Sequence, residues 1–262
     1  MRPVALTIAG SDPSGGAGIQ ADLKTFHQFG VYGEAVITLL TVQNTRRVSR
    51  VECLDPELIR QQAEAVLEDI PPAAAKTGAL GNAAIIEAVA KLWRGLSIPL
   101  VVDPVMISKH GAPLIAEEAR AALVELLIPL AALVTPNLHE AAALAGYPVD
   151  SLDSMKRAAE TILGFGCGAV LVKGGHLAGT ATDVLLSTGG FLVLEAERTD
   201  TIHTHGTGCT YSAAITALLA SGVPLEDAVA RAKKFITAAI RSNPGLGGGS
   251  GPVNHFADLG ED

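Results

Sequence analysis

The chain has 262 residues, of which 48% are hydrophobic and only 4% aromatic, so its core must be built largely from aliphatic side chains. Its 27 acidic residues outnumber its 19 basic ones, and the net charge of −8 argues against nucleic acids and anionic membranes as partners. The sequence contains no apolar run of membrane-spanning length, no signal peptide and no metal-ligand spacing among its 3 cysteines, so we expect a cytoplasmic protein with reduced cysteines.

The first part of the chain alternates between apolar runs and helical patterns. Gly30 ends one helix, and Asp55-Pro56 begins the next with an N-cap residue followed by proline at the first helical position. Pro71-Pro72 stops that second helix. The pattern predicts strands at 4–9, 35–42, 74–77 and 100–103, and helices at 18–29, 55–69 and 82–93.

The second part continues the alternation and adds one hairpin. Two apolar runs flank Gly189-Gly190 and predict an antiparallel pair at 182–187 and 191–195. The other predicted elements are strands at 132–135 and 169–172 and helices at 117–128, from 137 onward, 153–163, after 208 and 225–241. Strand–helix alternation predicts an α/β fold with a central, mostly parallel sheet and helices on both faces. We see no linker, so we expect a single domain over residues 1–262.

Polar side chains stand where the predicted strands end. In open α/β sheets, ligands bind beyond the carboxyl ends of the strands. The residues in that position are Asp12, Gln43, Lys76, Asp103, Asn137, Lys173 and the loop 206–209. Their convergence on one edge of the sheet predicts a ligand site there.

The stretch 201–219 carries the strongest single signal for a site. It begins with Gly206-Thr207-Gly208 and becomes an Ala- and Leu-rich run, which predicts a glycine loop opening into a helix. Such a loop points backbone N–H groups and the positive end of the helix dipole at one spot, which suits a phosphate. Cys209 stands at the first helical turn, where its thiolate is favoured. The alternative is that Cys209 is a small buried core residue.

Two glycine patterns near the N-terminus match nucleotide-binding motifs incompletely. Residues 16–21 fit G-x-G-x-x-A, but 11–15 separate them from the strand, and the next strand ends in Gln43-Asn44 rather than an acid. Residues 10–15 have Walker spacing, but Gly16-Ala17 replaces the Lys and Ser/Thr. Both a nicotinamide-dependent oxidoreductase and a P-loop enzyme are therefore disfavoured.

Asn137 and Glu140 have the spacing of a helix capping box. The alternative places Glu140 near a Mg²⁺ shell, with Asp103 sharing the metal and Asn137 near a phosphate. Mg²⁺ favours few carboxylates and several waters. The spacing alone favours the capping role for Glu140.

Lys173 precedes Gly174-Gly175, which fits either a strand end and turn or a point charge for a nucleotide phosphate. Gln43 carries both a donor and an acceptor, so it can read the edge of a heterocycle or bond to neighbouring backbone. His203 and His205 are interpreted as polar loop residues, because no third metal ligand is spaced with them.

The chain resembles the hydroxymethylpyrimidine/phosphomethylpyrimidine kinases of thiamine biosynthesis, within the ribokinase-like superfamily. The matching stretches are A-L-T-I-A-G-S-D-P-S-G-G-A-G-I-Q-A-D-L-K-T-F, V-Q-N-T, V-V-D-P-V-M, T-P-N-L-H-E-A, V-K-G-G-H and T-H-G-T-G-C-T-Y-S-A-A-I. They follow one another in family order over nearly the whole chain.

The resemblance implies a role for each candidate site residue. It implies substrate binding by Gln43, Asp22 and Gly10; an anion hole and catalytic group formed by Gly206, Thr207, Gly208 and Cys209; ATP binding by Lys173, Asn137 and Gly175; and a Mg²⁺ site at Asp103 and Glu140. In most of the superfamily an Asp base occupies the position of Cys209, and a Cys is typical of the pyrimidine-kinase branch.

The implied reaction is ATP- and Mg²⁺-dependent phosphorylation of 4-amino-5-hydroxymethyl-2-methylpyrimidine to its monophosphate and then to the diphosphate, at one site. Cys209 would accept or relay the proton of the hydroxymethyl group, and Lys109 would help to offset charge repulsion in the second step. A pyridoxal or pyridoxine kinase, or a kinase with both activities, is the nearest alternative. A non-catalytic pyrimidine-binding protein is a more distant one. We also expect a homodimer.

Overall fold

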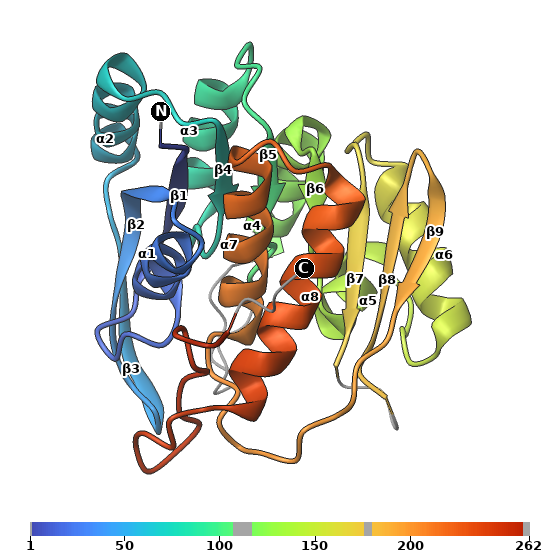
Figure 1. The fold of residues 1–262 in the computed structure, drawn as a ribbon. Helices are drawn as coiled ribbons and strands as arrows, with labels where there is room; N and C mark the ends of the chain where they lie inside the picture. The colour runs from blue at the N-terminus through green and yellow to red at the C-terminus, as the bar shows by residue number, and fades with distance from the viewer. Residues whose placement is uncertain (1, 107–116, 176–179, 259–262) are drawn as a thin grey trace.

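The computed structural model describes residues 2–106, 117–175 and 180–258, and its strands form one nine-stranded sheet within those ranges. The strand order is β3-β2-β1-β4-β5-β6-β7-β8-β9 (Figure 1). The strands are β1 (Val4–Ser11), β2 (Tyr32–Asn44), β3 (Arg47–Cys53), β4 (Ala74–Thr77), β5 (Leu100–Val102), β6 (Leu133–Val134), β7 (Val170–Gly174), β8 (Thr182–Ser187) and β9 (Gly190–Leu194). Lys109, which we expected to help the second step, lies outside the described residues.

The centre of the sheet is parallel and its edges are antiparallel. Parallel pairing joins β2 to β1, β1 to β4, and onward through β5 and β6 to β7. Antiparallel pairing adds β3 at one edge and the β8–β9 hairpin at the other. The predicted mostly parallel sheet and the predicted hairpin are therefore confirmed.

Helices cover both faces of the sheet (Figure 1). One layer contains α2 (Pro56–Asp69), α3 (Ala83–Trp93), α4 (Glu117–Ala122), α5 (Leu138–Ala145) and α6 (Leu152–Leu163), and the other contains α1 (Gly18–Gln28), α7 (Thr207–Ala220) and α8 (Leu225–Arg241). None of the helices in the described ranges is long and apolar enough to cross a membrane.

The period-two alternation of strand side chains divides the core between the two faces. Leu6 and Ile8 of β1 pack with the layer of α2 and α3, whereas Ala5 points to the opposite face and packs with Phe26 of α1. A sheet buried on both faces explains why the parallel strands are apolar almost throughout.

Two segments differ from the sequence prediction. β3 was not predicted, because its sequence, Arg47 to Cys53, is rich in charged residues; it is an edge strand whose side chains are largely exposed. The predicted helix 117–128 is regular only to Ala122 and continues as a π-helical turn, Leu123–Leu127, and a 3₁₀ turn, Ile128–Leu130. Pro129 supplies the reason, because it has no N–H to continue the α-helical pattern.

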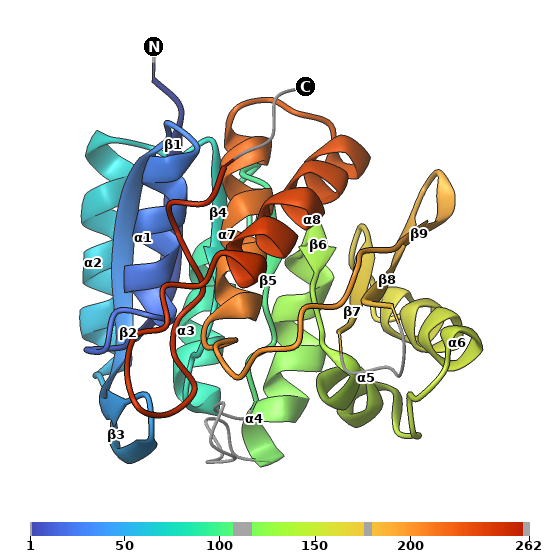
Figure 2. The same ribbon diagram turned by 60° about the horizontal axis from the view of Figure 1, so that its bottom comes forward.

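The edge at which the parallel strands end faces forward in Figure 2, and segments distant in sequence meet there. The loop before α7 and the glycine-rich segment 245–251 lie beside the turn between β2 and β3 (Figure 2). This arrangement places the start of α7 next to the loop that follows β1.

Candidate active site

A cavity of about 810 Å³ opens at this edge of the sheet, and it is lined by all twelve residues to which the resemblance assigned substrate binding, catalysis, ATP binding or Mg²⁺ binding. These residues are Gly10, Asp22, Gln43, Asp103, Asn137, Glu140, Lys173, Gly175, Gly206, Thr207, Gly208 and Cys209. Lys76, also expected at this edge, is fully buried and does not line the cavity. The structure thus brings together groups from strand ends that are far apart in the sequence. The individual roles of these residues stay predictions.

The start of α7 has the features of an anion-binding loop. Gly206 is the N-cap, with φ of 76°, and within the described residues no side chain caps the helix. The side chain of Thr207 instead donates to the backbone of Thr204 at 2.8 Å. The backbone N–H of Thr207 also donates to the Thr204 carbonyl, at 3.3 Å. The N–H groups of the next two residues, Gly208 and Cys209, which line the cavity, are those left for an anion, and the helix dipole favours one there.

We expect Gly206→Ala to lower kcat by roughly 100-fold or more, the loss seen when one anion-hole donor is removed. A Cβ at this position would overlap the carbonyl oxygen of Gly16, so the loop must move. Gly222→Ala is the matched control, because Gly222 follows the same helix with φ of 80° and a Cβ there meets no described atom within 4 Å. The control should lose only roughly 1–2 kcal/mol of stability and retain wild-type kcat; equal kcat losses would contradict the assignment.

A buried ion pair lies against the start of α7. Lys76 Nζ donates to Asp22 at 2.7 Å and lies 3.4 Å from the Cys209 carbonyl oxygen, and the hydroxyl of Thr7 donates to Asp22 at 2.7 Å. Both members of the pair are fully buried. Burial opposes both charges: it raises the Asp22 pKa, but on Lys76 the charges of Asp22, Cys209 and Asp103 together outweigh it and hold the Lys76 pKa above its usual value. The 2.7 Å contact and the charged lysine identify the two as an ion pair. Asp22 thus supports the cavity floor as well as lining it.

The expectation of a favoured thiolate at Cys209 is wrong for the protein without ligands. Desolvation raises the pKa of the Cys209 thiol to about 11, although one side of the residue faces the cavity. Lys76 lowers this pKa, but the nearby carboxylates of Asp22 and Asp103 act in the opposite direction. Cys209 is therefore a neutral thiol near pH 7.

Asp103 forms the centre of a second buried cluster. It accepts hydrogen bonds from Lys173 at 2.9 Å, Thr135 at 3.1 Å and Ser212 at 3.2 Å. Burial alone would raise the Asp103 pKa, but Lys173 and Lys76 outweigh it and hold the pKa below its usual value. The cluster therefore contains an ionised carboxylate paired with a lysine at the cavity wall.

The capping box predicted for α5 is confirmed. Asn137 accepts from the backbone of His139 and Glu140, and Glu140 accepts from the backbone N–H of Asn137 at 2.8 Å. Burial, together with the charge of Asp103, raises the Glu140 pKa to about 7. Glu140 therefore caps the helix and also lines the cavity with a carboxylate whose ionised form is disfavoured by burial.

The donor set fits Mg²⁺. Asp103 and Glu140 both line the cavity, and a divalent cation would offset both the burial of the Glu140 charge and the smaller repulsion from Asp103 that raise the Glu140 pKa. Their oxygens are the ligands that Mg²⁺ prefers. Within the part of the chain that the structure describes, no group of three or more His, Cys, Asp or Glu side chains could hold a metal. Water and phosphate oxygens would have to complete the shell.

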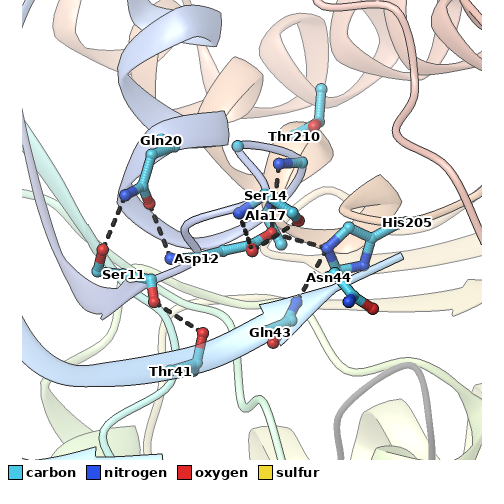
Figure 3. Close-up of polar contacts among 12 residues, drawn as sticks. Ser11, Asp12, Ser14, Ala17, Gln20, Thr41, Gln43, Asn44, His205 and Thr210 are labelled. Atoms are coloured by element: carbon cyan, nitrogen blue, oxygen red, sulfur yellow. Dashed lines mark hydrogen bonds and ion pairs between the residues drawn. The ribbon is translucent and has the colours of Figure 1, made fainter. Parts of the chain in front are cut away.

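A polar network that the sequence did not predict lies at the Gln43 end of the cavity (Figure 3). His205 Nε2 lies 2.8 Å from Asp12 Oδ2 and 3.1 Å from the Gln43 carboxamide nitrogen. His205 was interpreted as a polar loop residue, yet it is buried. Its place directly before the glycine loop was the available signal.

Known proteins match the chain over nearly its whole length. A family model described as phosphomethylpyrimidine kinase matches residues 12–254. The hydroxymethylpyrimidine/phosphomethylpyrimidine kinase of Streptomyces coelicolor is 47% identical over 259 residues, covering 99% of this chain and 96% of that protein. The thiamine biosynthesis bifunctional protein ThiED of Geobacter sulfurreducens is 49% identical over 257 residues, covering 97% of this chain and 52% of that protein.

The fold is also shared with a solved kinase structure. The ADP complex of Bacillus subtilis pyridoxal kinase has a TM-score of 0.91 and 42% identity, and the match covers 98% of both chains. The predicted ribokinase-like α/β fold is thereby confirmed.

Proposed function

The chain belongs to the phosphomethylpyrimidine kinase family, and from that premise we propose that it phosphorylates 4-amino-5-hydroxymethyl-2-methylpyrimidine and then the resulting monophosphate, using ATP, in thiamine biosynthesis. The observation that carries this proposal is the full-length match combined with a cavity in which Cys209, the glycine loop and Gln43 all meet. Cytoplasmic location is part of the same proposal.

The likeness to a pyridoxal kinase keeps a second substrate open, since that protein has the same fold at 42% identity. Incubation of the purified protein with ATP and either the pyrimidine alcohol or pyridoxal, followed by mass analysis of the products, separates the possibilities. We expect the pyrimidine monophosphate and then the diphosphate. Formation of pyridoxal phosphate alone, or no product at all, would reject the proposal.

In this proposal, phosphoryl transfer depends on positioning and charge stabilisation rather than covalent catalysis. Gln43 holds the ring, and the N–H groups at the start of α7 stabilise the transferring phosphoryl group. Because Cys209 is a neutral thiol, it suits a relay: Sγ receives the hydroxyl proton while its own proton passes to a phosphoryl oxygen.

The nucleotide phosphates would lie against Lys173, Asn137 and Gly175. Lys173 supports this role because Asp103 and Glu140 outweigh its burial and hold the Lys173 pKa above its usual value, so the ammonium is charged. Mg²⁺, held through Asp103 and Glu140, would neutralise part of the charge on the phosphates. In the second phosphorylation the acceptor is already an anion, so no proton relay is required.

Glu140→Gln separates the capping role from the metal role, because a capping box tolerates Gln at this position. We expect the Mg²⁺ concentration that gives half-maximal activity to rise roughly tenfold or more. The pH dependence of stability supplies a second measurement. The folded protein favours protonated Glu140, so the contribution of Glu140 to the free energy of unfolding is fully present below its usual pKa of 4.5 and is lost as pH rises through about 7.

Without Mg²⁺, the difference in free energy of unfolding between Glu140→Gln and wild type should therefore shift in favour of the variant as pH rises between those two values. Above about pH 7 the difference should stay constant. An unchanged Mg²⁺ titration would mean that Glu140 only caps α5.

We also propose a homodimer. Exposed apolar side chains near the end of β2, at Leu40 and Val42, would contribute to its contact surface. Sedimentation of wild type against Val42→Lys tests this surface, because only the variant should sediment as a monomer. A monomeric wild type would remove the proposal.

A further inference from the structure

Asp12 is surrounded by hydrogen-bond donors. Its Oδ1 accepts from the backbone and hydroxyl of Ser14, at 2.9 and 2.7 Å, and its Oδ2 accepts from the backbone of Gly16 and Ala17, at 3.2 and 2.9 Å. Burial would raise the Asp12 pKa, but the bonds from His205 and Ser14 outweigh it and hold the pKa below its usual value. Asp12 is therefore ionised and can only accept hydrogen bonds.

This arrangement determines where the hydrogen of His205 lies. Nε2 of the imidazole is 2.8 Å from Asp12 Oδ2, so the lone pair of an unprotonated Nε2 would face the carboxylate oxygen and be repelled by it. A hydrogen on Nε2 instead gives a charge-assisted bond between two buried side chains. His205 is therefore a donor at Nε2.

Gln43 completes the network at the same nitrogen (Figure 3). The end of its carboxamide lies 3.1 Å from His205 Nε2. An NH₂ group facing an Nε2–H would set two donors against each other, whereas a carboxamide oxygen can share this one hydrogen with Asp12 Oδ2 in a three-centre bond. A half-turn of the carboxamide exchanges nitrogen and oxygen without changing its shape.

We propose that His205, held by Asp12, is a positioning residue that fixes the Gln43 carboxamide with its oxygen on the imidazole and its NH₂ group in the cavity, as a donor to an acceptor nitrogen of the substrate ring. The proposal rests on the proposed function for the identity of that ring. A neutral aminopyrimidine offers such a nitrogen, whereas a ring protonated at nitrogen would meet a donor.

The backbone around His205 makes this positioning rigid. His205 donates to the Gly251 carbonyl at 3.0 Å, and its own carbonyl accepts from Val253 at 3.3 Å. A Cβ on Gly16 would lie 2.6 Å from the imidazole Cδ2, so glycine leaves the room that the ring needs. Because His205 directly precedes Gly206, one segment links recognition of the ring to the anion loop.

The first test measures the hydrogen on His205 directly. Two-bond ¹H–¹⁵N spectra of protein with ¹⁵N-labelled histidine report which ring nitrogens carry hydrogen, and the His205→Gln spectrum identifies the signals. We expect Nε2 of His205 to be protonated. A spectrum with hydrogen only on Nδ1 would overturn the proposal. This result is independent of the substrate, so it stands apart from the proposed function.

The second test uses Gln43→Glu, which keeps an oxygen for His205 and removes the NH₂ group from the cavity. We expect KM for the pyrimidine alcohol to rise roughly 10- to 100-fold, as for a lost buried hydrogen bond, with KM for ATP within about threefold of wild type. If Gln43 presents its oxygen to the ring, the variant keeps a wild-type KM, which would overturn the proposal.

The third test compares two substitutions of His205. His205→Phe keeps a ring but removes the donor, while His205→Gln keeps a donor of similar reach. We expect the pyrimidine KM to rise in the Phe variant and to recover in the Gln variant at similar thermal stability. Equal KM values in both would show that His205 only packs. Wild-type turnover of the pyrimidine, measured first, tests the proposed function separately.

Discussion

Cys209→Ala is expected to slow phosphorylation of the pyrimidine alcohol by roughly 100-fold or more, the usual contribution of a positioned proton-transfer group, while slowing phosphorylation of the monophosphate only about two- to fivefold. The alcohol must lose a proton as the phosphorus–oxygen bond forms, whereas the acceptor phosphate is already an anion. Each acceptor is given to the variant separately, and single-turnover rates are compared with wild type.

Cys167→Ala is the matched control, because Cys167 is a buried free cysteine in the core beside α6 and should leave both rates unchanged. Equal losses in the two steps of Cys209→Ala would mean that Cys209 shapes the loop rather than handling the proton. Failure of wild type to form any diphosphate would remove the two-step reaction altogether.

The raised pKa of Cys209 adds a pH test to the same experiment. If the neutral thiol relays the proton, the rate of the first step should stay level between roughly pH 7 and 9. A thiolate base with a pKa of about 11 would instead make the rate rise about tenfold per pH unit over that range. A steep rise that disappears in Cys209→Ala would therefore contradict the relay.

The alternation of strands and helices was predictable because each buried parallel strand is an uninterrupted apolar run and each helix has its own start signal. Asp55 and Asn82 cap their helices as expected, each accepting from the backbone. β3 could not be predicted in the same way. Its stability comes from pairing with β2, for example Leu39 with Cys53, and not from burial of its own side chains.

Those parts of the candidate site were predictable that consist of backbone groups at a helix start or side chains at a strand end. The glycine loop and Asp103 follow from the sequence because a helix start and a strand end fix where they lie. His205, by contrast, is 193 positions from Asp12, and only the folded chain brings the two together. The neutral state of Cys209 also depends on the fold, because burial of the thiol and, to a smaller extent, the nearby carboxylates of Asp22 and Asp103 raise its pKa, and only the folded chain supplies them.

Lys76→Met is expected to lower the free energy of unfolding by roughly 3–5 kcal/mol, because it leaves Asp22 as an unpaired buried charge. Lys76 and Asp22 are both 0% exposed, and Nζ lies 2.7 Å from the carboxylate. Arg50→Met is the matched control: it breaks a pair with Glu52 whose side chains are 69% and 57% exposed, and such a pair contributes only about 0–1 kcal/mol. Chemical denaturation measures both.

The double variant Lys76→Met/Asp22→Asn separates the pair from its effect on the thiol. Removing both charges should recover most of the lost stability, because no unpaired ion remains in the core. Lys76 lowers the Cys209 pKa and Asp22 raises it, so the single variant should shift alkylation of the thiol to higher pH and the double variant should partly reverse that shift. A thiol whose alkylation profile is the same in all three proteins would show that Lys76 supports the floor of the cavity without influencing the proton on Cys209.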